Sequence, residues 1–451
     1  MANPLHTLAS DIVDLARQAG ADAAEVYIRR GSENEVQVRN GVIETLQSGQ
    51  PKSLGLRLWQ GERSASTYAT DLRLDPVRRL IASTLELVPL TDPVPESALA
   101  AREQLATNIP DLDLFDEAVE RLSAETRLAW AREAEEVGRQ SDPRITVSGG
   151  ASVSDLAIEH VLATSHGFCN GYRESFASIA AELIADDAEG KKRNGSWYSY
   201  GRHLSQLESP AAVGRTAASR AVRQLGAAPV ATQKLPVVFD PLPAASLVGL
   251  LFSVLTGGAV ERRSSFVADQ LGQRVAGSNV TLVDDPHLVR GPGSRPFDGE
   301  GLPTSRTAFI DGGELRSFAL NLYASRRLGL APTGHASRPS SGAPGESHGN
   351  LFLAPGDRDP AELIAEVRHG FYCEGMMGFG FNPATGDFSR GASGRMIVDG
   401  RLAQPVSEVT LSINFKDLLS SIDGIGRDLD HRRSVASPTF RVREVTLAGR
   451  G

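Results

Sequence analysis

The histidines of this chain are spaced unfavourably for metal chemistry. A zinc peptidase usually places two histidines about one helical turn apart, with a glutamate beside the first, so that ligands and base share one helix face. None of the nine histidines lies three to five residues from another, and the closest two, His160 and His166, are six apart. The sequence therefore predicts no local zinc-binding helix.

A dispersed site is the alternative, because folding can bring distant residues together. It would make the chain itself a peptidase that uses a metal or a thiol, and its candidates are His335, His348, His369 and Cys373. We expect the loop histidines to be solvated instead. No cationic neighbour in the sequence would lower the pKa of Cys373, so a packed thiol is the preferred interpretation.

Two other stretches are dense in constrained residues. Residues 298–304 (DGEGLPT) contain Asp298 and Glu300, and they could form a tight structural turn or could position backbone near a substrate. The glycine pattern Gly375, Gly378, Gly380 precedes no helix and follows no clear strand, which is a poor fit to a dinucleotide-binding fingerprint. The sequence favours the structural interpretation for the acidic turn.

Composition indicates a protein with a substantial core. The 451 residues are 41% hydrophobic and 23% charged, which suggests two or three domains. The net charge of −8 argues against direct binding of nucleic acid or of an anionic membrane. The two cysteines form no Cys-x-x-Cys pair, and no signal-peptide or membrane-span pattern is present, so we expect a reduced, cytoplasmic protein.

The patterning of the first half predicts α+β structure. Residues 1–95 form an α+β unit with hairpin turns at Asn40-Gly41 and Gln60-Gly61. Residues 88–110 resemble a linker. A second α+β segment, 112–226, is expected to pack with the first and to begin with one long helix over 115–140.

The remaining residues, 230–451, predict a mostly β, barrel-like C-terminal domain with few helices. A buried strand over 235–239 leads into an apolar helix from about Ala244, which carries no histidine, cysteine or acidic residue before Glu261. We expect 332–349 to be an exposed, mobile loop and 415–429 to be helical.

From about residue 10 to residue 449 the chain resembles the PmbA/TldD family, and in particular its TldE (PmbA) branch. The resemblance rests on six segments: 36–44 (VQVRNGVIE), 263–266 (RSSF), 297–304 (FDGEGLPT), 375–394 (GMMGFGFNPATGDFSRGASG), 423–429 (DGIGRDL) and 445–449 (VTLAG). In this family the TldD subunit resembles a zinc protease with a His-Glu-x-x-x-His helix and a late cysteine ligand. Here the helix positions hold Phe252, Ser253 and Gly257, and residues 430–435 contain no cysteine.

The resemblance implies a metal-free subunit without catalytic residues of its own. Zinc is expected on a TldD-like partner in a heterodimeric protease, whose enclosed chamber admits unfolded or extended peptides. This chain would shape the chamber and grip the peptide backbone, with 375–394 as the expected sheet edge for strand addition. The expected substrate-binding residues are Gly378, Phe379, Gly380, Asn382, Asp298 and Glu300.

Two alternatives concern partners. A homodimer could form when the chain is alone, since related chains can reuse one interface. The family is also associated with modulation of DNA gyrase, which would make the chain a protein-binding modulator.

Overall fold

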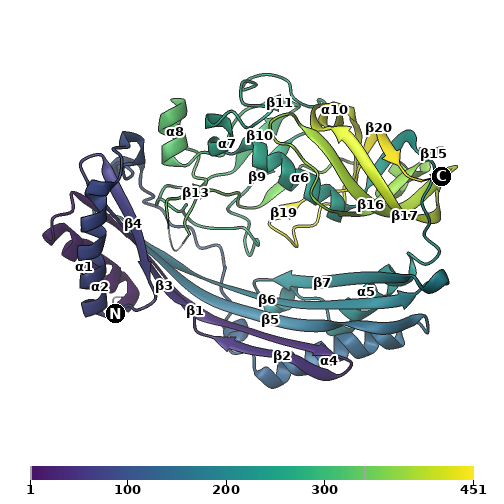
Figure 1. Ribbon diagram of the computed structural model, residues 1–451, viewed down its shortest axis with the longest axis horizontal. Helices are drawn as coiled ribbons and strands as arrows, with labels where there is room; N and C mark the ends of the chain where they lie inside the picture. The colour runs from purple at the N-terminus through teal and green to yellow at the C-terminus, as the bar shows by residue number, and fades with distance from the viewer. Residues whose placement is uncertain (1–2, 340–341, 451) are drawn as a thin grey trace.

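A long antiparallel sheet and a β-barrel domain lie opposite each other in the computed structural model, which describes residues 3–339 and 342–450 (Figure 1). The sheet has the order β4-β3-β1-β5-β6-β7, with β2 pairing to the second half of β1. Its strands are β1 Ala23–Arg39, β2 Val42–Gly49, β3 Lys52–Gln60, β4 Arg63–Ala69, β5 Ile145–Thr164, β6 Cys169–Asp186 and β7 Lys192–Gly201.

The predicted hairpin turns of this sheet are confirmed. Asn40 and Gly41 both have positive φ, 52° and 75°, as a two-residue turn between twisted strands requires. The turn expected near Gln60-Gly61 consists of Gly61 and Glu62, which join β3 to β4, and of these two only Gly61 has positive φ, 58°.

Four helices cover the long sheet. Helices α1 (Pro4–Gln18) and α2 (Leu74–Leu87) pack at one end, and α4 (Ala124–Gln140) and α5 (Pro210–Val222) lie on its outer face (Figure 1). The single helix expected over 115–140 is wrong, because α3 (Glu117–Glu120) ends before α4 begins. Ser123 is the reason: its hydroxyl accepts a hydrogen bond from the Thr126 N–H and starts a new helix.

The stretch expected to be a linker is packed. Residues 88–110 contain the short 3-10 helices η1 (Val88–Leu90), η2 (Pro95–Ser97) and η3 (Arg102–Gln104). Ala100, Leu105 and Ala106 are buried in one cluster with Phe168 and Phe297. The segment therefore connects the two halves of the molecule through an apolar contact.

The C-terminal domain contains a closed five-stranded barrel. Its strands are β8 Gln233–Phe239, β15 His369–Met377, β16 Asp387–Val398, β17 Arg401–Asn414 and β20 Phe440–Ala448. They pair in the order β17-β16-β15-β8-β20, and pairing of β17 with β20 closes the ring. The α+β class with a barrel-like C-terminal domain is thus confirmed. Asp399 and Gly400, both with positive φ, form the tight turn between β16 and β17.

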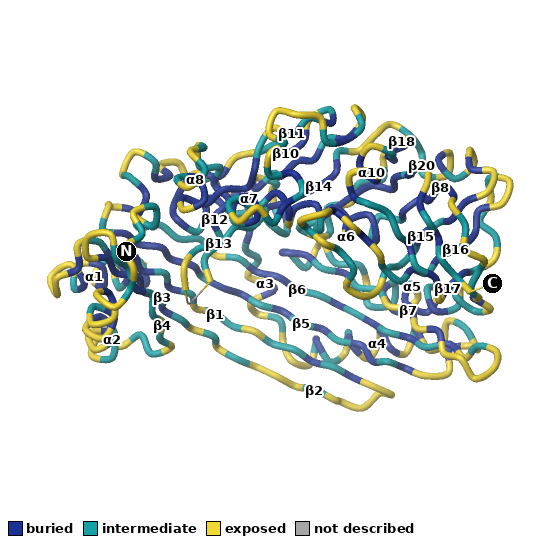
Figure 2. Tube along the Cα trace, turned by 45° about the horizontal axis from the view of Figure 1, so that its top comes forward, coloured by how far each residue is buried: buried dark blue, intermediate teal, exposed yellow. Residues whose placement is uncertain are grey.

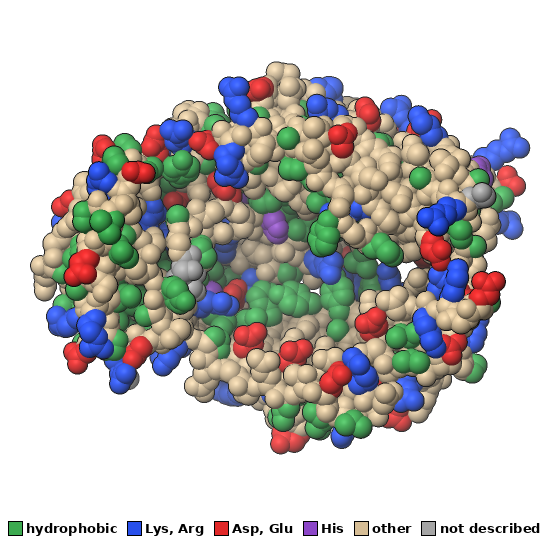
Figure 3. Space-filling view, viewed as in Figure 1, with side chains coloured by type: hydrophobic (Ala, Val, Ile, Leu, Met, Phe, Trp, Pro, Cys, Tyr) green, Lys and Arg blue, Asp and Glu red, His purple; other side chains and the backbone are tan. Residues whose placement is uncertain are grey.

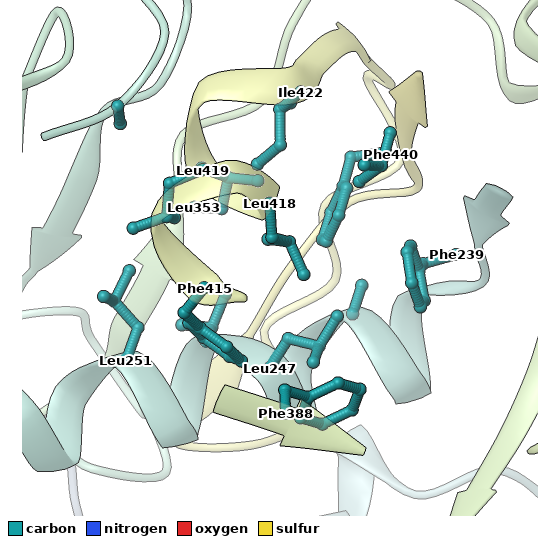
Figure 4. Close-up of a cluster of buried hydrophobic side chains, with 14 of the residues drawn as sticks. Phe239, Leu247, Leu251, Leu353, Phe388, Phe415, Leu418, Leu419, Ile422 and Phe440 are labelled. Atoms are coloured by element: carbon teal, nitrogen blue, oxygen red, sulfur yellow. The ribbon is translucent and has the colours of Figure 1, made fainter. Parts of the chain in front are cut away.

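Helix α6 (Pro241–Leu255) fills the centre of this domain. Figure 4 shows Leu247 and Leu251 directed toward α10 (Phe415–Ser421), where they meet Phe415 and Leu418. The expected helix over 415–429 is wrong in its second half, since α10 ends at Ser421. The next residues form β18 (Ile422–Ile425), which pairs with β20.

Shorter elements complete the domain. They are α7 Gly257–Glu261, β9 Leu282–Asp284, β10 Thr307–Asp311, β11 Glu314–Leu315, α8 Leu322–Leu328, β12 Ala336–Ser337, β13 Gly345–Glu346, β14 Leu351–Leu353, α9 Pro360–Ala365 and β19 Val435–Ala436. Buried residues alternate with half-buried or exposed ones along the barrel strands and the middle strands of the long sheet, whereas β2 is mostly exposed (Figure 2). Within the described residues, no helix is both long and apolar enough to cross a membrane.

Candidate functional site

Helix α6 has one apolar face and one small, polar face. Its first turn is capped by Asp240, whose carboxylate accepts the Leu242 N–H, and Pro241 occupies the first helical position. Ser246 and Ser253 are exposed and Gly249 is half-buried. Because these three positions recur at helical spacing, they form the face that points away from the barrel core.

The three positions at which the resemblance implies a zinc motif hold none of the usual zinc ligands, histidine, cysteine, aspartate or glutamate. The Phe252 ring packs edge-on against Phe309 and against the imidazole of His348, with centroids 5.8 Å and 5.0 Å away. The Ser253 hydroxyl donates to the Leu250 carbonyl at 2.6 Å. Neither side chain is directed as a ligand would be.

Gly257 is closed off by its neighbours. Helix α6 ends at Leu255, so Gly257 belongs to the separate helix α7. A Cβ atom at Gly257 would lie 2.5 Å from the Ala324 Cβ, which is closer than real contacts allow. The adjoining Gly258 N–H donates to the Glu346 carboxylate at 3.2 Å. The position has room for a glycine and none for an imidazole.

Two of the histidines expected to be solvated are enclosed. His335 is 1% exposed, with its ring between the Asp284 carboxylate (Nε2–Oδ2 3.2 Å) and the Thr333 hydroxyl (2.8 Å). His348 donates from Nδ1 to the Gly349 carbonyl at 2.9 Å, and burial lowers its pKa. The exposed-loop prediction for 332–349 is therefore wrong at these positions, and residues 340–341 lie outside the described residues.

The remaining candidates of the dispersed site lie elsewhere. His369 is exposed at the start of β15 and contacts the Gln233 amide. Cys373 is fully buried, and burial raises the pKa of its thiol, which confirms a packed thiol. Over residues 3–339 and 342–450, no three histidine, cysteine or acidic side chains are grouped so that they could hold a metal ion.

Asp298 and Glu300 form a buried structural turn. Asp298 Oδ1 accepts the N–H groups of Glu300 and Leu302 at 2.9 Å, and Oδ2 accepts the Ala336 N–H. Glu300 accepts the Leu322 N–H at 2.8 Å. With 2% and 8% of their surfaces exposed, these carboxylates hold the chain together and do not face a substrate. Their assignment to substrate binding stays a prediction that the geometry does not favour.

Glu300 predicts a specific pH dependence of stability. Burial, together with repulsion from Asp298, raises the pKa of Glu300 to about 8. The folded protein therefore holds this proton more tightly than the unfolded chain, so stability is full below the ordinary pKa of 4.5 and falls as pH rises through 8. We therefore expect the free energy of unfolding, measured in urea, to fall less for Glu300→Gln than for wild type as pH rises from about 5 to about 9.

The matched control for this measurement is Glu103→Gln, which changes an exposed carboxylate. It should keep the wild-type dependence on pH. Equal pH slopes for Glu300→Gln and wild type would contradict the buried, protonated carboxyl.

Residues Gly378, Phe379, Gly380 and Asn382 lie at the tip of the β15–β16 hairpin. Phe379 is fully exposed, and Asn382 accepts the Ala384 N–H in a tight turn. The tip contacts its own hairpin, because a Cβ atom at Gly380 would strike the Ser389 carbonyl. The expectation of an open sheet edge in 375–394 is wrong for β16, which has β15 and β17 on its two sides in the closed barrel.

A hollow lies between the polar face of α6 and the inner face of the long sheet. Figure 3 shows this depression, with hydrophobic side chains on its floor. It includes a cavity of about 640 Å³ whose walls come from the sheet, from α6 and from 433–435. Sequence reasoning missed its residues Tyr198, Tyr200 and Arg433. The alternation of the two tyrosines along one strand was the available signal.

Comparison with known proteins identifies the family. Models of the PmbA/TldA metallopeptidase match in three parts: domain 1 at residues 24–88, the central domain at 117–225 and the C-terminal domain at 232–449. The chain belongs to this metallopeptidase family. The resemblance to PmbA/TldD proteins, including the PmbA branch, is thereby confirmed.

Individual relatives of the PmbA/TldA family are similar over nearly their whole length. The metalloprotease PmbA of Escherichia coli O157:H7 is 33% identical over 429 residues, which cover 95% of this chain and 93% of the relative. A PmbA homologue of Haemophilus influenzae is 29% identical and covers 99% and 96%. These relatives carry the name metalloprotease.

Solved structures of the family share the fold. A candidate modulator of DNA gyrase from Bacteroides thetaiotaomicron has a TM-score of 0.92 at 27% identity and covers both chains completely. TldE from Thermococcus kodakarensis has a TM-score of 0.87 at 18% identity, with coverage of 98% of this chain and all of the other, which shows the fold alone.

The metal implied by the family name does not fit this chain. A zinc site needs three or four nitrogen, sulfur or carboxylate donors at about 2.0–2.3 Å. Phe252 and Gly257 supply none, and the Ser253 hydroxyl is engaged with its own helix. The residues present therefore support no metal-dependent step on this chain.

Proposed function

We propose that this chain is the metal-free, TldE-like subunit of a heterodimeric, cytoplasmic metalloprotease that processes unfolded or extended peptides. Zinc chemistry would belong to a TldD-like partner, and this chain would shape the chamber and hold the substrate. The observation that carries the proposal is the blocked position Gly257 in α7, together with Phe252 and Ser253 at the two positions of α6 where the resemblance implies zinc-site residues.

The hollow beside α6 supports the chamber role. The face of α6 that carries Ser246, Gly249 and Ser253 points to the long sheet. Helix α6 therefore lines the hollow although it has no zinc ligands. A helix that has lost its ligands and keeps small residues on this face suits a wall along which a peptide can lie. Substrate would contact this wall in place of the β16 edge, which the barrel closes.

Peptide hydrolysis with the separated and mixed subunits tests the proposal. We expect no cleavage of an unfolded substrate by this chain alone, and chelator-sensitive cleavage once a TldD-like partner is added, because the metal would lie on the partner. The matched control is a mixture in which the first histidine of the partner's zinc helix is replaced, which should assemble without cleaving.

Cleavage by this chain alone would contradict the proposal. It would favour the rival interpretation of an independent peptidase if it were also lost on replacement of His369 or Cys373. The raised pKa of the Cys373 thiol opposes that rival, because the thiol form is a poor nucleophile.

A further inference from the structure

One guanidinium group at the hollow has no ion-pair partner. Arg433 is exposed and lies over the Tyr198 ring, with its guanidinium carbon 4.6 Å from the ring centroid. Among the described residues no carboxylate forms an ion pair with Arg433, whereas the adjacent Arg432 is paired with Glu208 and Asp430. The arrangement leaves one positive charge available at the rim of the cavity.

The cavity beside Arg433 is suited to the end of a peptide. Its sheet wall is formed by Tyr198 and Tyr200, which alternate along β7 and so point to the same face. Its opposite wall is the small-residue face of α6, with Val435 beside Gly249. Aromatic and small apolar surfaces therefore surround a space of about 640 Å³, which is in the usual range for a ligand site.

The charge on the walls favours an anionic group at this end. None of the described residues that line the cavity is acidic. The acidic side chains Glu33 and Glu35 line the adjoining hollow of about 190 Å³ instead, where Asp155 is already paired with Arg127. A carboxylate in the hollow would therefore be repelled from that side and attracted to Arg433.

A buried polar atom beside Arg433 also lacks a partner. The Tyr198 hydroxyl is shielded from solvent and makes no hydrogen bond within the described residues. Leaving a buried hydroxyl without a hydrogen-bond partner costs free energy, so an acceptor atom beside the Tyr198 hydroxyl would be favourable. A peptide carboxylate that displaces the exposed Arg433 side chain slightly would supply this acceptor for the Tyr198 hydroxyl.

We propose that this cavity is a carboxylate-binding subsite, in which Arg433 pairs with the C-terminal carboxylate of an extended peptide while Tyr198, Tyr200 and the α6 wall hold its last side chain. The same chemistry could come from a glutamate side chain within a peptide, and the experiment separates the two sources. The inference rests on the proposed function, because it assumes that peptides enter this hollow.

Calorimetric titration of the full chain with N-acetylated hexapeptides of alanine and valine tests the subsite. One peptide is a free acid, the second a C-terminal amide, and the third an amide with one internal glutamate. We expect the free acid to bind about tenfold more tightly than either amide, since one charge-assisted hydrogen-bonded pair is lost. Arg433→Gln should remove this preference, and Arg433→Lys should retain part of it.

Two further variants sharpen the test. Tyr198→Phe keeps the ring under Arg433 and should weaken binding of the free acid only. Arg401→Gln removes another exposed arginine, which lies in the β16–β17 hairpin and does not line the cavity, and should keep the full preference.

Several results would overturn the subsite. Equal affinity of the free acid and the plain amide, or an unchanged preference in Arg433→Gln, would do so and would leave the chamber role intact. Tightest binding of the glutamate peptide would assign the site to acidic side chains instead of chain ends. No binding of any peptide would also overturn it, while hydrolysis by the mixed subunits separately decides the proposed function.

Discussion

Arg202→Ala is expected to lower the free energy of unfolding by about 3–5 kcal/mol, the range for breaking a buried ion pair. Arg202 is 1% exposed and joins the long sheet to the C-terminal domain. Its guanidinium donates to the Glu174 carboxylate at 3.0 Å and to three carbonyl groups, those of Gly291, Pro292 and Ser294. Alanine would leave the largely buried Glu174 carboxylate and three carbonyl acceptors without this donor.

Urea unfolding at neutral pH measures this loss. The control is Arg121→Ala, which removes an exposed i,i+4 pair with Glu117 and should cost about 0.3–0.5 kcal/mol. If Arg202→Ala lowered the free energy of unfolding no more than the control does, Arg202 would not hold the long sheet and the C-terminal domain together.

The dependence of stability on acidic pH gives a second measurement of the same Arg202–Glu174 interaction. Burial opposes ionisation of Glu174, but hydrogen bonds and charges from His160 and Arg202 outweigh it and lower the pKa of Glu174 to about 2. The stability that this carboxylate contributes is therefore present above its ordinary pKa and is lost as pH falls toward 2. Without Arg202, acid unfolding should begin at a higher pH than in wild type.

Restoring the family's zinc motif on α6 is expected to fail. In the triple variant F252H/S253E/G257H, the imidazole at 257 would have to displace Ala324 and Leu320, whose atoms lie 2.5 Å and 2.8 Å from a Cβ at that position. Overpacking of this kind costs about 1–3 kcal/mol or more. We expect this variant to have a lower melting temperature than wild type and to hold no stoichiometric zinc after dialysis against a buffer that contains zinc.

Single-glycine variants separate packing from metal chemistry. Gly257→Ala should be destabilised for the same steric reason. Gly249→Ala should be neutral or stabilised by up to about 1 kcal/mol, because its Cβ would meet only Val435 at 3.9 Å and alanine favours a helix. Stoichiometric zinc in the triple variant would show that the site had lost only its ligands and not its shape.

Features that depend on a few adjacent residues could be predicted from the sequence. The hairpins at Asn40-Gly41 and Asp399-Gly400 follow from the positive φ that their tight turns require, and the amphipathic spacing of α1 and α2 predicts helices. The α+β class follows from the same local patterns. The missing zinc ligands at Phe252 and Gly257 are also visible in the sequence, because a side chain without a donor atom cannot bind a metal in any fold.

Features that depend on distant contacts could not be predicted. The burial of His335 involves contact with Asp284, which lies far away in the sequence on β9, and the closure of the barrel follows from pairing of β17 with the last strand. The hollow joins Tyr198 from the long sheet to Arg433 from the far end of the chain. Local backbone preferences act over a few residues and thus determine turns, helices and the absence of ligands. Only packing between remote segments decides which charges are buried, which strand edges are closed and where a cavity remains.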